Sequence, residues 1–408
     1  MSIKRAFLIF SWALYDLANQ FFALNVVSLY YVRWLTLEKQ VPEIFYSISF
    51  GVSLFFVGIL SPVLGAISDL TQRRRIFLIQ LTVLSVVFTL FLGLTANVAL
   101  SLIFFAVANF GCQLAIIFNN AQMIEIAPQG KVGLVSGFGR MLGYSGAIIA
   151  MYLAKPIVLE RGYQATFIPS GLLFLLFALP CMIFVRDPHS RQNIRLAYFF
   201  RGERVIASFA ALRKALLEVR KVASLANFLK AAFFGLAAVN VIILFMSVYA
   251  TRVFGLSEIQ IIHLIVFSTL FAIAGSIVSG FISDYIGYKR CLMGVFILWI
   301  AAFIGASISR DIRLYWAMGA IVGAALGATW VVSRALAIKL VPPEKIGEVF
   351  GLFNFVGYIS AIMGAVFWGL ALLFLSRFGE SGYRIALASL ILFMGLGFVY
   401  LRRLPQDK

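Results

Sequence analysis

Residues 65–75 read Gly-Ala-Ile-Ser-Asp-Leu-Thr-Gln-Arg-Arg-Arg, and residues 280–290 read Gly-Phe-Ile-Ser-Asp-Tyr-Ile-Gly-Tyr-Lys-Arg. In both stretches a glycine stands four residues before an aspartate, and a basic cluster follows. Both stretches also end a long apolar run, and their offset is 215 residues, from 65 to 280. Repetition at a fixed offset indicates a duplicated architecture, in which other parts of the chain repeat at the same spacing.

Two further pairs of similar segments are separated by the same offset, to within one residue. Ala23-Leu-Asn-Val-Val returns as Ala238-Val-Asn-Val-Ile. Six residues also recur 214 positions later, namely Pro128, Lys131, Gly133, Gly137, Gly143 and Tyr144 as Pro342, Lys345, Gly347, Gly351, Gly357 and Tyr358. Three matches in three parts of the chain predict two related halves with the same orientation, as in a parallel repeat about an axis along the membrane normal.

The composition places this chain in lipid, because 408 residues with 62% hydrophobic and only 12% charged residues do not make a water-soluble surface. The apolar runs reach about 20 residues, the length that a helix needs to cross the hydrocarbon core. We expect an all-α membrane protein with twelve spans near residues 7–31, 44–67, 76–95, 98–123, 132–154, 166–185, 225–250, 258–282, 291–308, 314–338, 346–371 and 383–400.

The basic residues predict the orientation of these spans. Most of the 34 Lys and Arg residues fall on alternate loops, which favours cytoplasmic termini and a multi-pass bacterial inner membrane protein. The net charge of +18 therefore follows the topology and faces the anionic leaflet, so nucleic acid is not an expected partner. The predicted domains are a six-helix bundle at 1–186, a basic amphipathic linker at 187–223 and a second six-helix bundle at 224–408.

Catalytic and metal chemistry find no support in the residue pattern. Cys112, Cys181 and Cys291 are single and widely spaced, and the chain has only two histidines, His189 and His263. No nucleophile stands beside a base in any recognisable motif. We therefore expect neither a cofactor nor a metal, and no enzymatic activity.

The repeated loop resembles the signature loop of the major facilitator superfamily of transporters. Three more stretches are similar to the autophagy-related vacuolar effluxer family and its bacterial relatives: Ser-Trp-Ala-Leu-Tyr-Asp-Leu-Ala-Asn at 11–19, Pro-Val-Leu-Gly-Ala at 62–66 and Val-Ser-Gly-Phe-Gly-Arg-Met-Leu-Gly-Tyr at 135–144. The resemblance covers nearly the whole chain. It implies two pseudo-symmetric six-helix bundles, alternating access at a site between them, and amino-acid efflux as the activity of the eukaryotic members.

The resemblance also implies a gating role for the repeated loops. In that superfamily the loop aspartate faces the amino end of a helix in the other half, where unpaired amides favour an anion. We expect this role for both loops, that is for Gly65, Asp69, Arg73, Arg74 and Arg75 and for Gly280, Asp284, Lys289 and Arg290. The alternative for the three arginines is that they serve only as determinants of topology.

Polar residues at membrane depth are the candidates for substrate binding or proton coupling, because they are costly unless they face a partner or a cavity. They are Asp16, Asn19, Gln113, Asn120, Arg140, Tyr144, Arg334 and Asn354. At the repeat offset Asp16 corresponds to Ala231 and Arg140 to Asn354, so the fold itself does not require these two charges. We expect Asp16 to exchange a proton and Arg140 to favour a carboxylate. A fixed ion pair between them is the alternative.

Two functions remain open on the sequence alone. The first is a secondary transporter of a small organic solute, such as an amino acid or another carboxylate, coupled to protons and functional as a monomer among membrane lipids. The second is a translocase or exporter of lipids or lipophilic compounds, which the 41 phenylalanines permit without requiring.

Overall fold

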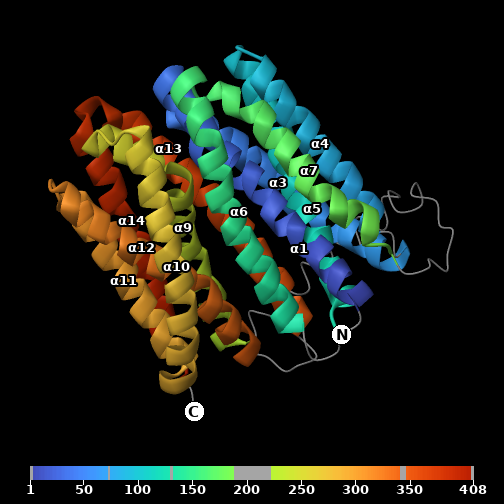
Figure 1. Ribbon diagram of the computed structural model, residues 1–408. Coiled ribbons are helices and arrows are strands. Elements are labelled where there is room, and N and C mark those ends of the chain that lie inside the picture. The colour runs from blue at the N-terminus through green and yellow to red at the C-terminus, as the bar shows by residue number, and fades with distance from the viewer. Residues whose placement is uncertain (1–2, 72–73, 129–131, 188–221, 341–345, 406–408) are drawn as a thin grey trace. The chain divides into compact units, whose positions relative to one another are not determined.

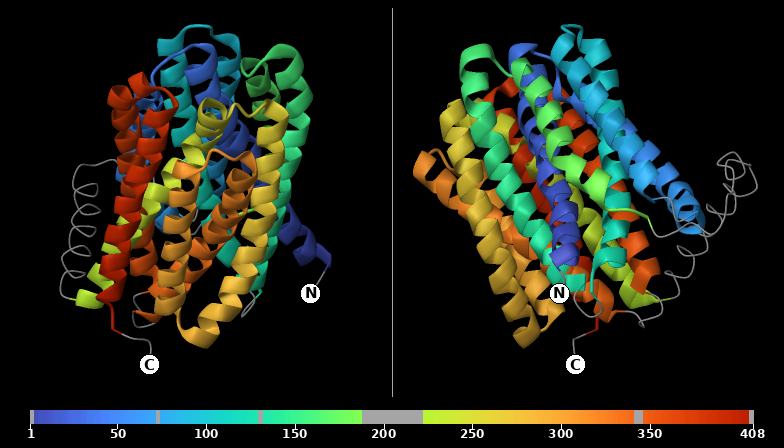
Figure 2. Two further views of the ribbon diagram at one scale, coloured as in Figure 1. Left: turned by 90° about the vertical axis from the view of Figure 1, so that its left-hand side faces the viewer. Right: turned by 45° about the vertical axis from the view of Figure 1, so that its right-hand side comes forward.

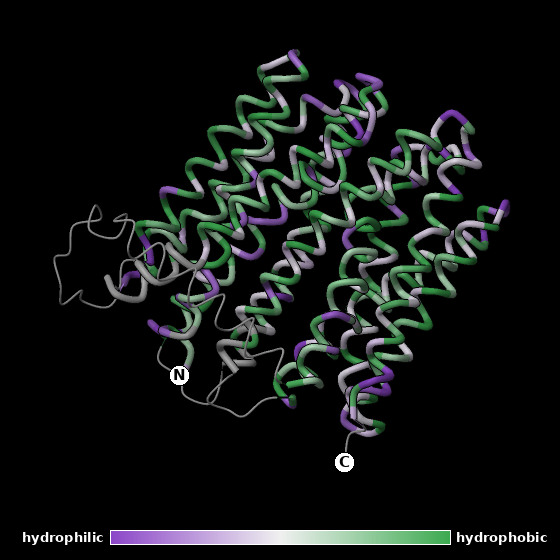
Figure 3. The backbone as a smooth tube through the Cα atoms, turned by 180° about the vertical axis from the view of Figure 1, so that it is seen from behind, coloured by the Kyte–Doolittle hydropathy of each residue, from purple (hydrophilic) through white to green (hydrophobic). Residues whose placement is uncertain are grey.

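A computed structural model describes residues 3–71, 74–128, 132–187, 222–340 and 346–405 of the chain. Within these ranges every regular element is a helix, and twelve helices are long and apolar enough to cross a membrane. Hydrophilic positions gather mostly at the helix ends, and hydrophobic positions fill the middle (Figure 3). The predicted twelve-span, all-α class is confirmed.

The described chain divides into two compact units, comprising Met1–Val41 with Val52–Leu212, and Pro42–Gly51 with Arg213–Lys408. The helices of the first half are α1 (Ile3–Phe22), α3 (Glu43–Thr71), α4 (Arg74–Leu94), α5 (Val98–Ile126), α6 (Val132–Arg161) and α7 (Phe167–Phe184) (Figure 1). Those of the second half are α9 (Ala223–Phe254), α10 (Glu258–Ile286), α11 (Tyr288–Ile308), α12 (Ile312–Lys339), α13 (Ile346–Leu375) and α14 (Glu380–Arg402).

Each unit uses the same packing pairs. In unit 1, α1 packs on α6 and α7, and α4 packs on α5 and α7. At the repeat offset these pairs become α9 on α13 and α14, and α11 on α12 and α14, all of which are found in unit 2. Within each unit the long helices run side by side (Figure 2). The duplicated sequence thus produces two pseudo-symmetric six-helix bundles.

The first membrane span is longer than the sequence predicts. Beyond Phe22 the helix continues through π-helical turns at Ala23–Tyr30 and Trp34–Glu38, joined by a short α-helical turn at Tyr31–Arg33. The whole span covers 36 residues, Ile3–Glu38. A wider helical turn changes which side chains share a face, and periodicity of the ordinary α-helix does not reveal such a change.

The predicted linker lies outside the described residues from 188 to 221. Its first residue, Asp187, is described and binds the start of α4. Both carboxylate oxygens accept the backbone N–H of Arg75, at 2.9 and 3.1 Å. Burial raises the pKa of Asp187, and hydrogen bonds from the backbone of Arg75 and Arg74 oppose that rise. An acidic group at a helix N-terminus is a stabilising cap.

Candidate functional site

Asp16 lies against a glycine of the neighbouring helix α6. A Cβ atom built on Gly139 would come within 2.7 Å of Asp16 Oδ2 and 2.9 Å of the Trp12 ring. One built on Gly146 would come within 2.7 Å of the Leu17 carbonyl oxygen. Glycines that allow two helix backbones to approach are a common packing device in membranes. Here they also bring the Asp16 carboxylate onto the surface of α6.

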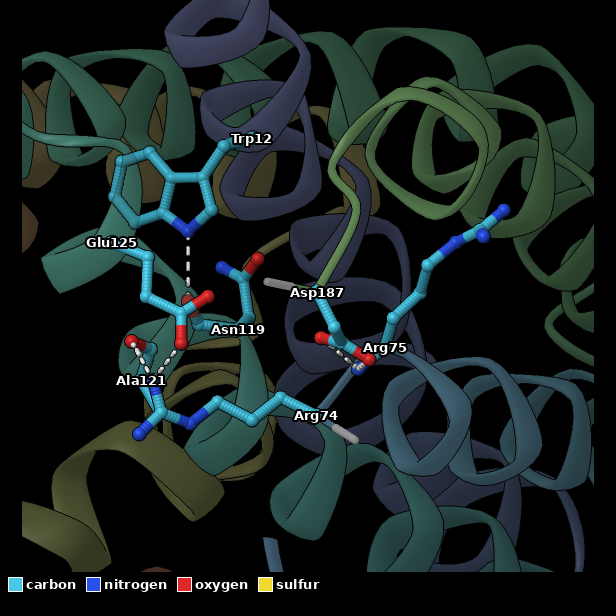
Figure 4. A network of polar contacts seen from close by, with 7 residues as sticks. All are labelled: Trp12, Arg74, Arg75, Asn119, Ala121, Glu125 and Asp187. Carbon is cyan, nitrogen blue, oxygen red and sulfur yellow. Dashed lines mark hydrogen bonds and ion pairs between the residues drawn. The ribbon is translucent and has the colours of Figure 1, made fainter. Parts of the chain in front are cut away.

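Polar groups of α1, α5 and α7 form a network that reaches this carboxylate through Asn119. Asn119 of α5 donates its side-chain amide to Asp16 Oδ1 at 3.5 Å. The backbone carbonyl of Asn119 accepts the Trp12 indole N–H at 2.8 Å (Figure 4). The Cys181 thiol of α7 lies 3.6 Å from Asn119 Oδ1 and 3.7 Å from Gln122 Oε1. One turn after Asp16, Asn19 Oδ1 accepts from Cys112 at 2.9 Å.

Arg140 supplies the positive charge of the site. It directly follows Gly139, the glycine of α6 against which Asp16 lies, and its side chain is exposed. In the described part of the chain the two groups do not close a salt bridge within 4 Å. The structure thus places a carboxylate and a guanidinium on neighbouring helices, with Asp16 partly buried and Arg140 exposed.

The other predicted transport residues are spread over both units. In unit 1, Gln113 and Tyr144 are partly buried and Asn120 is exposed. In unit 2, Arg334 and Asn354 are exposed. Two of the predicted residues lie close to Asp16 along the helices: Asn19 is one turn further on α1, and Arg140 follows Gly139 on the neighbouring helix α6.

Asn119 was not among the predicted transport residues, and Trp12 and Gly139 lie in the stretches that carry the family resemblance but were given no role of their own. Asn119 and Asn120 are adjacent, and a helix turns about 100° between them, so a small error in helix phase exchanges their faces. Cys112, Asn119 and Gln122 recur at steps of seven and three, which places them on one face. This polar face of α5 is the sequence pattern from which Asn119 could have been identified.

The signature loops are described in part. Arg73 lies outside the described residues, and the contacts of Gly65 and of the Asp69 side chain are likewise not described, so the gating role of these three residues stays a prediction. Arg74 forms an ion pair with Glu125 of α5 at 2.6 Å and donates to the Ala121 carbonyl at 3.2 Å (Figure 4). At an offset of 214 residues, as in the second group of repeated residues, Arg74 corresponds to Tyr288 and Glu125 to Lys339, and the Lys339 ammonium lies 5.6 Å from the centre of the Tyr288 ring. One inter-helix contact is thus kept in both units with different chemistry.

Arg75 and Lys289 occupy equivalent places and cap equivalent helices. Arg75 Nε donates to the Met182 carbonyl at the end of α7 at 2.5 Å. Lys289 Nζ donates to the Arg402 carbonyl at the end of α14 at 3.1 Å, and also to the Leu404 carbonyl. Cations at a helix C-terminus satisfy its free carbonyls and its dipole. These two residues therefore stabilise their own units, whatever part they take in gating.

The remaining loop residues of unit 2 lie at its surface. Asp284 is exposed and accepts a hydrogen bond from the Tyr288 hydroxyl at 2.8 Å. Arg290 is also exposed, and a Cβ on Gly280 would make only an ordinary contact with Val331, at 3.9 Å.

Replacing Lys289 by methionine is expected to lower the free energy of unfolding by about 2–3 kcal/mol, because two carbonyls at the end of α14 lose a charged donor. Thermal unfolding of the detergent-purified protein measures this loss. Arg290→Met removes an exposed neighbouring charge, and about 0.5 kcal/mol or less is expected for it. A Lys289→Met protein as stable as the wild type would contradict the capping role.

Comparison with known proteins agrees with this architecture. The sequence model described as Major Facilitator Superfamily matches residues 17–365 and 228–407. An uncharacterised protein of Aquifex aeolicus (strain VF5) is 27% identical over 363 residues, which cover 88% of this chain and 87% of that protein. The uncharacterised MFS-type transporter YxiO of Bacillus subtilis (strain 168) is 24% identical over 419 residues, covering 97% and 94%.

Solved structures of transporters share the fold. A bacterial homologue of the human lysosomal transporter Spinster, in an inward-facing and unoccupied conformation, has a TM-score of 0.74 at 16% identity and covers 99% of this chain and 98% of its own. A variant of the nucleoside transporter NupG has a TM-score of 0.78 at 12% identity and covers 98% and 99%. With the family model spanning most of the sequence, this chain belongs to the Major Facilitator Superfamily of membrane transporters.

Proposed function

We propose that this protein is a proton-coupled secondary transporter of a small organic solute that bears a carboxylate, such as an amino acid. The observation that carries the proposal is the pair of opposite charges on α1 and α6, Asp16 and Arg140, which lie near each other without forming a salt bridge in the described chain. A solute carboxylate can then bind the guanidinium while the Asp16 carboxyl group takes up or releases a proton.

Membrane depth supports a functional reading of Asp16. The residue lies 13 positions after the start of α1 at Ile3, or roughly 20 Å along the helix at 1.5 Å per residue. An ionisable side chain at such depth is costly and usually marks a substrate or proton pathway. Its amide and thiol neighbours, Asn119 and Cys181, carry no formal charge that would fix it in one form.

The repeat supports the same reading. Ala231 stands in unit 2 where Asp16 stands in unit 1, and it is 1% exposed. At this place of the fold a small apolar residue thus suffices for packing. A carboxylate found in only one of two equivalent positions is better explained by transport than by stability.

A thermal-shift screen of the purified protein tests the proposal, since a ligand that binds the folded state raises its stability. Amino acids, small carboxylates, peptides and lysolipids are compared on the wild type, Asp16→Asn and Arg140→Ala. We expect one small polar class to stabilise the wild type, with a ligand-dependent shift of about 4 °C or more at a hundredfold excess over Kd. That shift is expected to disappear in Arg140→Ala.

Matched controls separate the site from general surface charge. Arg161→Ala, on the same helix as Arg140 and also exposed, is expected to keep the shift. Stabilisation by lysolipids alone, equal in all variants, would favour a translocase of lipids or lipophilic compounds and leave Asp16 and Arg140 with structural roles.

The membrane and the orientation complete the proposal. The basic loops favour cytoplasmic termini in a bacterial inner membrane, and one chain contains both six-helix bundles, so a functional monomer is proposed. Efflux is the direction that the vacuolar effluxer resemblance suggests.

A further inference from the structure

Helix α3 belongs to both compact units. It is one continuous helix, Glu43–Thr71, yet Pro42–Gly51 clusters with unit 2 while the following residues, from Val52 on, cluster with unit 1. Alternating access requires the two bundles to move against each other. A helix fastened in both of them resists that motion unless one of its two ends is released.

The attachment to unit 2 has a polar part. Glu43 accepts a hydrogen bond from the Tyr383 hydroxyl at the start of α14, and Arg252 at the end of α9 also hydrogen-bonds Tyr383. Glu43 and Tyr383 are each 6% exposed. The start of α3, the end of α9 and the start of α14 therefore meet at the buried Tyr383 side chain.

The attachment also has an apolar and a steric part. Tyr46 packs edge-to-face on Phe245, with ring centres 5.5 Å apart, and Phe245 stacks on Trp368 at 5.8 Å. A Cβ on Gly369 would come within 2.7 Å of the Ile44 Cα atom and 2.8 Å of Ser47 Oγ. The first turns of α3 thus lie directly on the glycine surface of α13.

We infer that residues 42–51 are a detachable latch, and that Glu43 with Tyr383 and Arg252 forms its clasp on the membrane side opposite the termini. Successive spans cross the membrane in opposite directions, and α3, α9 and α14 are the second, seventh and twelfth of the twelve spans. The start of α3, the end of α9 and the start of α14 therefore all lie on that side. A buried carboxylate that leaves its partners for water regains its hydration, so a polar clasp separates at lower cost than apolar packing of the same area. Release of the latch frees unit 2 from α3 and lets that side open.

This inference rests on the alternating access of the proposed transporter, but it does not depend on the cargo or on Asp16. Its test accordingly uses no substrate. Ser47 is fully buried, and its hydroxyl donates to the Glu43 carbonyl of its own helix, so Ser47→Cys is a small change that reports exposure of the latch. The rate at which a polar maleimide modifies position 47 is measured in lipid nanodiscs by peptide mass spectrometry.

Glu43→Gln and Tyr383→Phe are each expected to raise the modification rate at position 47, on the order of tenfold, because each replaces the Glu43–Tyr383 hydrogen bond with a weaker contact or none. The double variant is expected to exceed the larger single effect by less than twofold, since both changes break one contact. Glu380→Gln, an exposed carboxylate one turn from Tyr383, is the matched control and is expected to leave the rate unchanged.

Three outcomes would overturn the latch. Rates within twofold of the parent in both single variants would show that the clasp does not hold α3. Fully multiplicative effects in the double variant would show two separate contacts. Parallel modification of the buried Cys112, Cys181 and Cys291 would show general loosening of the bundles instead of local release.

Discussion

Asp16→Asn is expected to abolish accumulation of substrate driven by a pH gradient, with a fall in rate on the order of a hundredfold, while exchange of labelled for unlabelled substrate continues. Asparagine keeps the size of the side chain and its hydrogen bond with Asn119, but it cannot exchange a proton. Accumulation requires net proton movement, whereas exchange does not. Both are measured in proteoliposomes with the ligand found by the thermal-shift screen.

Glu160→Gln is the control for this experiment, because Glu160 is an exposed carboxylate on α6, far along the helix from Gly139. Both activities are expected to remain in that variant. Unchanged accumulation and an unchanged pH dependence in Asp16→Asn would disprove coupling through Asp16. Loss of exchange together with accumulation would instead assign Asp16 to substrate binding.

Gly327→Val is expected to destabilise unit 2 by about 3 kcal/mol or more, because α10 and α12 approach each other through glycine. A Cβ on Gly327 would come within 2.0 Å of the Ala272 carbonyl oxygen, and one on Gly323 within 2.0 Å of the Ser268 carbonyl oxygen. Backbone atoms cannot turn away as a side chain can, so the two helices must separate. We expect a lower melting temperature and a smaller monodisperse fraction in size-exclusion chromatography.

Gly294→Val controls for the cost of placing a β-branched residue in a helix. Gly294 lies on α11, is exposed, and has no atom within 4 Å of an added Cβ. Its melting temperature is expected to stay within about 2 °C of the wild type. Equal losses in the two variants would show that helix propensity, not the α10–α12 contact, sets the effect.

Sequence reasoning succeeded where the physical constraint is local or repeated. Apolar length predicted the twelve spans because the hydrocarbon core has a fixed thickness. The repeated loop and its echoes predicted two pseudo-symmetric bundles, and the equivalent packing pairs of the two units bear this out. Both predictions, the twelve spans and the two bundles, depend only on composition and spacing, which can be read from the sequence before the chain folds.

The candidate site was predicted less completely. Asp16, Asn19 and Arg140 were predicted from their polarity at membrane depth; the structure places Asn19 one turn from Asp16 and Arg140 on the neighbouring helix, and their part in transport stays a prediction. Asn119 was not separated from Asn120, since adjacent residues differ only in helix phase. Gly139 was missed because its role is to leave space, and an absent side chain gives no signal until the neighbouring helix is in place.

By itself, the sequence determined that this is a membrane protein of two duplicated six-helix halves. Each apolar segment must satisfy its own backbone hydrogen bonds in lipid, so each forms a helix independently of the others. The internal repeat shows which segments correspond in the two halves. Only the tertiary structure decided that Arg75 and Lys289 cap equivalent helices, that Trp12 and Asn119 border the Asp16 carboxylate, and that the start of α3 belongs with unit 2. These are contacts between residues far apart in the chain, and only helix packing fixes which of them meet.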